Sequence, residues 1–117
     1  MKILVIEDDD VVRSTLIDML KYKQHTAEGM ASAEEALLRL PGEYNLVISD
    51  ILLQGMDGVT LLAKVNEMKP GVPVVMITGY GEAELEEKCR KNGAAGFLKK
   101  PFTVQSLLDL VDEVAKK

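Results

Sequence analysis

The sequence predicts an α/β fold in which a parallel sheet lies between two layers of helices. Short runs of β-branched or aliphatic residues alternate along the chain with segments whose apolar residues have helical spacing. Three of the runs lack polar alternation, as strands buried on both faces do. Because the chain has 117 residues, five strand-then-helix units fill it as one compact domain of the doubly wound kind.

The strands and helices follow one another without a low-complexity stretch or a linker rich in Pro, Gly and Ser. Strands are expected at residues 2–6, 25–29, 46–49, 74–77 and 96–99. One-sided helices are expected over residues 12–20, 33–40, 59–68 and 104–114, with the last residue of the third, Met68, on the apolar side. Residues 81–93 form the weakest helix, because Ala83, Leu85 and Cys89 are the apolar residues it offers to a core.

Two helix starts carry capping residues. Ser32 has Glu35 three residues on, the spacing of a capping box, and Thr103 is placed to cap the last helix. Asp57 with Gly58 is interpreted as the start of the third helix. These residues are therefore assigned to helix starts.

Composition excludes several functions. The formal net charge of −5 and the pI near 4.9 provide no basic surface for nucleic acid or for an anionic membrane. No apolar run approaches the roughly 20 residues of a membrane-spanning helix. The single cysteine, Cys89, cannot form an internal disulfide, which agrees with a reducing compartment. A cytoplasmic protein without membrane or direct nucleic-acid contacts is expected.

Polar residues follow four of the five expected strands. The first strand ends at Glu7 and Asp8, the third at Asp50, the fourth at Thr78 and the fifth at Lys100. Ligands of such folds bind beyond the carboxyl ends of the strands, so these side chains should converge. Clustered carboxylates suit Mg²⁺, while a threonine and a lysine can bind a phosphoryl group.

Two further acids stand beside this cluster. Asp9 and Asp10 directly follow Asp8, and four adjacent carboxylates repel one another unless something compensates them. A bound cation and Lys100 can compensate the inner acids. We expect Asp9 and Asp10 to turn outward, toward the first turn of the following helix, where the helix dipole favours negative charge.

Four motifs in order resemble the receiver domains of two-component response regulators. The motifs are "ILVIEDD", "LVISDILLQGMDG", "VPVVMITG" and "GAAGFLKKPF", and the resemblance covers the whole chain. It implies a flavodoxin-like fold with strand order 2-1-3-4-5, five helices and three layers. It also implies one receiver domain over residues 1–117, either standing alone or taken from a longer regulator.

The resemblance implies that Asp50 accepts a phosphoryl group from a sensor histidine kinase or a phosphotransfer domain. Asp8, Asp50 and the backbone carbonyl of Leu52 would bind Mg²⁺, for which Mn²⁺ can substitute. Glu7 would act through a water. The spacing from Glu7 to Arg13 matches the spacing between the family's acid pair and its later arginine, which favours Glu7 and Asp8 as the pair. The competing assignment of the pair is Asp8 with Asp9.

The same resemblance implies how the signal is read. Thr78 and Lys100 would bind phosphoryl oxygens, and the bond before Pro101 would be cis. Phe97 would move with Thr78 and alter the face formed by the fourth helix, fifth strand and fifth helix, where an output domain or downstream protein binds. Phosphorylation-dependent dimerisation is left open.

Leu52 and Tyr80 take the two positions that flank the route of the hydrolytic water in this family. Neither side chain readily orients water, so we expect slow self-dephosphorylation. The loop after Asp50 lacks the proline common in relatives, and it is expected to be more mobile.

Three other functions are alternatives to a receiver domain. A haloacid-dehalogenase-like phosphatase would use Asp8 as its nucleophile, because Asp8, Asp10 and Val12 fit its Asp-x-Asp-x-Val pattern, although the chain lacks a cap domain. A nucleotide-binding module would need a Gly-rich turn where the acids stand. A pseudo-receiver would keep the fold for binding alone.

Overall fold

The computed structural model describes residues 1–116 and contains an alternation of strands and helices. The strands of the central sheet are β1 (Lys2–Ile6), β2 (Thr26–Met30), β3 (Leu46–Asp50), β6 (Val74–Thr78) and β7 (Gly96–Lys99). The helices are α1 (Asp10–Tyr22), α2 (Ala33–Arg39), α3 (Gly58–Met68), α4 (Ala83–Lys91) and α5 (Val104–Ala115). Two short strands, β4 (Leu52–Leu53) and β5 (Met56–Asp57), form a separate antiparallel hairpin.

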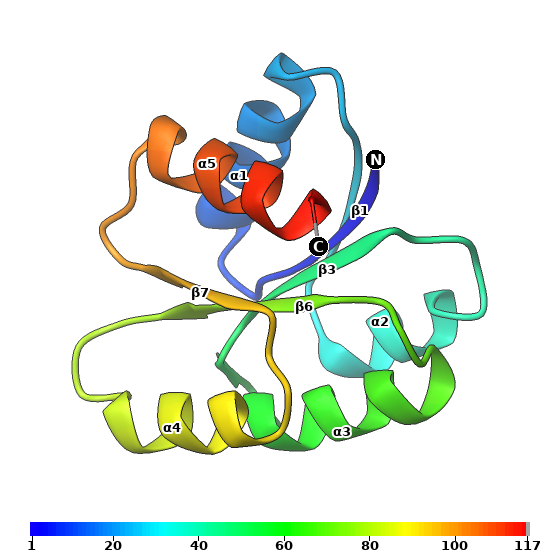
Figure 1. Cartoon of the computed structure of the whole chain (residues 1–117), viewed down its shortest axis with the longest axis vertical. Coiled ribbons are helices and arrows are strands. Elements are labelled where there is room, and N and C mark those ends of the chain that lie inside the picture. Colours follow the sequence, from blue (N-terminus) through cyan, green and yellow to red (C-terminus); the bar gives the residue numbers. More distant parts are fainter. Residues whose placement is uncertain (117) are drawn as a thin grey trace.

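The central sheet is parallel throughout, in the order β2-β1-β3-β6-β7. This is the expected order 2-1-3-4-5, because β6 and β7 are the fourth and fifth strands of the sheet. Helices α1 and α5 cover one face, and α2, α3 and α4 cover the other (Figure 1). The predicted three-layer, flavodoxin-like fold is confirmed.

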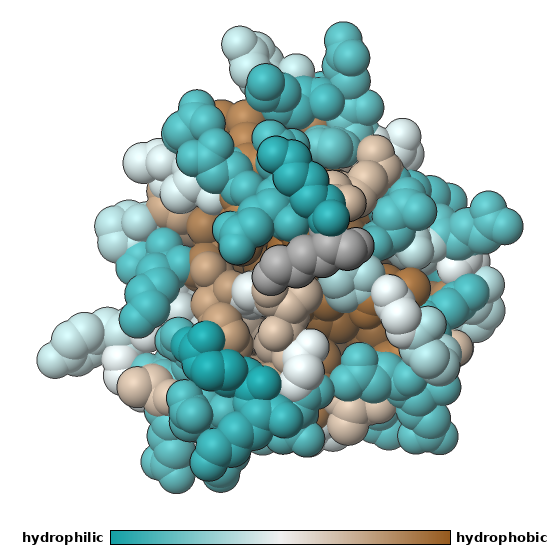
Figure 2. Space-filling model, viewed as in Figure 1, coloured by the Kyte–Doolittle hydropathy of each residue, from teal (hydrophilic) through white to brown (hydrophobic). Residues whose placement is uncertain are grey.

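The core has two halves, one on each face of the sheet. In β1, Ile3 and Val5 pack toward α1 and α5, while Leu4 and Ile6 pack toward α2 and α3. All four side chains are fully buried, as their continuous apolar run predicted. On the surface, Figure 2 shows hydrophilic residues over much of one side of the molecule, with hydrophobic residues in the recesses between them.

Most helix starts are capped by the residues that the sequence indicated. Asp9 accepts hydrogen bonds from the first turn of α1, Ser32 from Glu35 N, and Asp57 from Thr60 N. Thr103 forms a complete capping box. Its partner is Ser106: Thr103 Oγ1 accepts a hydrogen bond from Ser106 N, and Ser106 Oγ accepts one from Thr103 N.

Two local expectations need correction. Strand β2 begins at Thr26, one residue later than expected, because its mixed sequence "TAEGM" gives no clear alternation. Met68 is 42% exposed, since it lies at the end of α3. The segment after Asp50 forms the β4–β5 hairpin, and Gly55 takes the left-handed φ of 83° that its turn requires.

Within residues 1–116, no helix is both long and apolar enough to span a bilayer.

Candidate functional site

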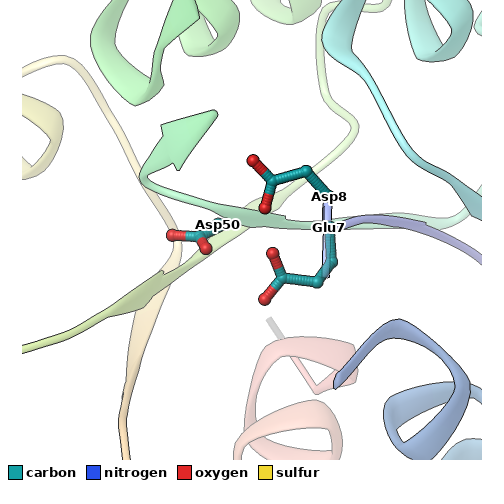
Figure 3. A group of neighbouring side chains, drawn as sticks. All are labelled: Glu7, Asp8 and Asp50. Carbon is teal, nitrogen blue, oxygen red and sulfur yellow. The ribbon is translucent and has the colours of Figure 1, made fainter. Parts of the chain in front are cut away.

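Three carboxylates converge at the carboxyl edge of the sheet. Glu7 and Asp8 follow β1, Asp50 ends β3, and the two strands are hydrogen-bonded neighbours. One carboxylate oxygen of each lies within 4.8 Å of the others, and Figure 3 shows the three side chains directed toward a common point. Glu7 and Asp50 are buried, whereas Asp8 is exposed.

The two outer acids turn away, as expected. Asp9 Oδ1 accepts hydrogen bonds from Val11 N and Val12 N at the start of α1. Asp10 pairs with Arg13 on the same helix. The structure therefore groups Glu7 with Asp8, in agreement with the favoured register, and uses Asp9 as a helix cap.

Lys100, the residue directly after β7, joins the cluster. Its Nζ lies 3.2 Å from Asp50 Oδ2 and 3.3 Å from Glu7 Oε1. Its backbone N–H donates to the Thr78 carbonyl at 2.8 Å, which holds the ends of β6 and β7 together. The following peptide bond, to Pro101, is cis.

The charges of this cluster shift one another's protonation. Burial, reinforced by the neighbouring Asp50 carboxylate, raises the pKa of Glu7 from 4.5 to about 7. Burial alone would lower the pKa of Lys100, but the attraction of Asp50 and Glu7 outweighs it and raises that pKa. The single ammonium of Lys100 thus contacts two carboxylates, so the cluster has more negative than positive groups.

Two buried oxygen atoms at this edge lack hydrogen-bond partners within residues 1–116: Glu7 Oε2 and Thr78 Oγ1. Thr78 ends β6, and the preceding Ile77 pairs with Asp50. Buried polar atoms in native structures are nearly always bonded, and exceptions mark sites where a ligand can supply the partner. The free hydroxyl and the free carboxylate oxygen are therefore available to a ligand.

The remaining expected residues surround the cluster. Leu52 donates its backbone N–H to Asp50 Oδ1 at 3.2 Å, and its side chain is about half exposed. Tyr80 is fully exposed. Phe97 is half-buried against the core under α4, and the Arg90 guanidinium lies 4.7 Å from the centre of its ring.

Sequence reasoning missed two supporting contacts. Arg13 Nη1 donates to the Glu7 carbonyl at 2.8 Å, and Gly29 leaves room for the arginine, since a Cβ there would lie 3.0 Å from its side chain. Glu82 accepts a hydrogen bond from Gly79 N at 2.6 Å. The spacing from Glu7 to Arg13 indicated the acid pair but not the atom that the arginine binds, and an acid three residues after a glycine is a weak pattern, so neither contact was predicted.

Chemically, the site offers a hard oxygen donor set beside one ammonium and one free hydroxyl. Such an arrangement can hold a divalent cation and an anionic group side by side. Lys100 contacts both Asp50 and Glu7, and Asp50 is the member of the carboxylate cluster that comes from β3.

Comparisons with known proteins all match one protein family. A family model described as "Response regulator receiver domain" matches residues 3–112. The response regulator protein FleR of Pseudomonas aeruginosa is 41% identical over 111 residues, which cover 94% of this chain and 24% of FleR. The transcriptional regulatory protein FixJ of Bradyrhizobium diazoefficiens is 30% identical, over 98% of this chain and 57% of FixJ. The chain thus spans only part of these relatives.

Solved structures agree. The receiver domain of NtrX from Brucella abortus superposes with a TM-score of 0.93 at 31% identity, covering 98% of each chain. A receiver domain protein from Methanospirillum hungatei gives a TM-score of 0.91 at 30% identity, over 98% of this chain and 94% of the other. None of these matches supports the phosphatase, nucleotide-binding or pseudo-receiver alternatives.

Proposed function

Since the chain belongs to the receiver domain family of two-component response regulators, which are phosphorylation-activated signalling switches, we propose that Asp50 is its phospho-acceptor. The observation that carries this proposal is the place of Asp50 at the end of β3: its carboxylate lies within 4.8 Å of those of Glu7 and Asp8, 3.2 Å from Lys100 Nζ, and beside the strand that ends at the free Thr78 hydroxyl. We also propose that residues 1–117 act as one receiver unit in the cytoplasm, alone or within a longer regulator.

In the proposed reaction, a carboxylate oxygen of Asp50 attacks the phosphorus of a phosphohistidine on a partner protein. A P–O bond forms, the P–N bond breaks, and the leaving imidazole takes the bonding electron pair. Asp50 becomes an acyl phosphate. Lys100 must exchange its present contact for a phosphoryl oxygen, and the free Thr78 hydroxyl donates to another. Catalysis would rest on positioning and charge neutralisation.

Glu7, Asp8 and Asp50 fit a magnesium ion. All offer carboxylate oxygens within 4.8 Å of one another, and the unpaired Glu7 Oε2 adds a free acceptor. Asp8, Asp50 and the Leu52 carbonyl would be direct ligands, and Glu7 would act through a water. When bound, Mg²⁺ or Mn²⁺ would neutralise the excess carboxylate charge and that of the phosphoryl oxygens.

We infer that the donor is a histidine kinase or a phosphotransfer domain that docks beside Lys100. An apolar groove between α1 and the segment after β7 includes Lys100 in its wall, so it is continuous with the phospho-acceptor site. Val11 in this groove is 74% exposed. Val11→Asp should leave labelling by small phosphodonors intact and weaken transfer from the donor protein.

The readout is proposed to be the face formed by α4, β7 and α5. A phosphoryl group adds about −1.5 to −2 charge near neutral pH. Thr78 would follow this charge and Phe97 would move with it, changing the affinity of the face for an output domain or downstream protein. The same face is our candidate for a phosphorylation-dependent dimer, which sedimentation of the phosphorylated protein would test.

Self-dephosphorylation is proposed to be slow. Leu52 and Tyr80 are exposed and stand two residues after Asp50 and Thr78, and neither carries a carboxylate or amide that orients a water. Leu52→Asn should therefore shorten the lifetime of the acyl phosphate. A wild-type lifetime of only seconds that Leu52→Asn does not change would contradict this.

The decisive experiment is to incubate the protein with Mg²⁺ and acetyl phosphate and to measure its intact mass. We expect a gain of one phosphoryl group in the wild type, and none in Asp50→Asn or after chelation of Mg²⁺. Asp18→Asn is the matched control, since Asp18 is an exposed aspartate on α1, and it should label like the wild type.

The other outcomes are equally informative. No mass gain in the wild type would favour a pseudo-receiver. Donor turnover that survives Asp50→Asn but is lost in Asp8→Asn would point to the phosphatase.

A further inference from the structure

Helix α4 contributes few apolar side chains to the core. It buries Cys89, and Leu85 is half-buried. Its N-cap residue, Glu82, makes no side-chain cap and bonds to Gly79 N instead. Charged side chains therefore add to a small apolar contact between α4 and the sheet.

These charged side chains form a connected chain of contacts between α4 and β7. Lys99 on β7 lies 3.8 Å from Glu86 Oε2, and Arg90 lies 3.1 Å from Glu86 Oε1. Arg90 Nε also contacts Glu87 at 3.5 Å. The side chain of Glu86 is 13% exposed, so it is a well-shielded anchor for the arginine.

The anchored arginine covers an aromatic ring. The Arg90 carbon between its nitrogens lies 4.7 Å from the centre of the Phe97 ring, within the range of a cation–π contact. Phe97 pairs with Met76 and Lys99 with Thr78 across the parallel strands β6 and β7. The side chains of Phe97 and Thr78 thus lie on the same face of the sheet, under α4.

We propose that Arg90 is a positioning residue for the movement of Phe97: held by Glu86 and Glu87, its guanidinium keeps the ring in its present place, so the strength of this contact sets how readily the phosphoryl-bound state forms. This inference rests on the proposed coupling of Phe97 to Thr78. It assigns the restraint on the ring to α4 itself.

Linkage fixes the direction of the effect. If the Arg90–Phe97 contact exists in the resting state and is lost in the phosphoryl-bound state, then weakening it favours binding of a phosphoryl group by the same factor. Cation–π contacts at partly exposed sites have strengths equivalent to about a two- to fivefold change in an equilibrium. Removal of Arg90 should therefore tighten binding by about that factor.

The test is titration with beryllofluoride, an aspartyl-phosphate analogue, in the presence of Mg²⁺. We expect Arg90→Ala to bind it about two- to fivefold more tightly than the wild type, with Arg90→Lys in between. Lys88→Ala is the matched control, because Lys88 is an exposed α4 cation whose nearest acid, Glu84, is 4.0 Å away. It should bind like the wild type.

A double-mutant cycle separates this role from a general effect of charge. In a Phe97→Leu background, Arg90→Ala should no longer tighten binding. In addition, the Phe97 ring resonances of free Arg90→Ala should shift toward those of the beryllofluoride-bound wild type. They can be assigned because Phe97 and Phe102 are the two phenylalanines of the chain.

Equal or weaker analogue binding by folded Arg90→Ala overturns the proposal, as does equal tightening in the Phe97→Leu background. Thermal unfolding of each variant verifies that it is folded, which is expected because the Arg90 side chain is 56% exposed. A wild type that binds no analogue contradicts the proposed function itself and the Arg90 role with it.

Discussion

Two glutamates near the start of the chain, one directly after β1 and one within β2, have opposite surroundings. Glu28, on β2, has both oxygens engaged: Tyr44 and Arg39 reach Oε1, and Lys2 reaches Oε2. Glu7, after β1, has one oxygen near Lys100 and one without a partner within residues 1–116. The pKa of Glu28 is lowered, chiefly by the Tyr44 hydrogen bond, whereas burial raises that of Glu7 to about 7.

The difference separates a structural ion cluster from a binding site. The side chain of Glu28 is 32% exposed, so water and its partners satisfy its charge. That of Glu7 is 1% exposed and shares a single ammonium with Asp50. A site that leaves a buried acid so poorly compensated is less stable on its own but keeps its oxygens free for a cation.

The largest expected effect is on stability as a function of pH. Because the folded-state pKa of Glu7 exceeds its ordinary value of 4.5, its contribution to stability is fully present below pH 4.5 and is lost as the pH rises through about 7. In the absence of metal, the free energy of unfolding of the wild type relative to Glu7→Gln should fall by up to about 3 kcal/mol over this window. Urea unfolding of both proteins at pH 4.5 and at pH 7 measures this difference in free energy. The same difference at the two pH values would contradict the prediction.

The second prediction concerns Mg²⁺. Glu7→Gln should weaken Mg²⁺ binding by about 10- to 100-fold, the usual effect of losing a residue that acts on a metal through a water. Glu28→Gln, the matched change in the structural cluster, should leave the affinity unchanged. Calorimetric titration of both variants with Mg²⁺ tests the contrast, and equal losses in the two variants would refute it.

The smallest effect is expected in the Glu28 cluster. Tyr44→Phe removes one hydrogen bond to a partly exposed carboxylate, so it should lower the free energy of unfolding by about 1 kcal/mol. The stability contributed by Glu28 changes with pH in the opposite direction to that contributed by Glu7. Stability from Glu28 is present above pH 4.5 and is lost as the pH falls through its lowered pKa. Unfolding curves of Glu28→Gln at pH 3 to 6 would show whether the sign is right.

The sequence predicted those parts of the fold and site that depend on strand order and strand ends. Glu7, Asp50 and Lys100 meet because parallel strands end at one edge, which the alternation of strands and helices already implied. The hairpin β4–β5 was missed, since two-residue strands carry no periodic pattern.

Contacts between long side chains on different elements could not be predicted from the sequence either. The Arg90–Phe97 contact joins α4 to β7, and it depends on how a helix with few buried residues is placed over the sheet. The weakness of α4 was visible in its residues. The identity of its charged partners depends on the distances between elements, which spacing alone does not give.

The order of the strands also determines what the sheet presents at its sides. Strands β2 and β7 lie at the two edges, so each has one row of backbone groups that no strand of the central sheet covers. The β7 edge is four residues long and ends at the charged Lys99, and β2 carries Glu28 at its centre. Short edges and charged edge residues disfavour edge-to-edge pairing of sheets, so we expect both edges of this sheet to resist stacking between copies of the chain.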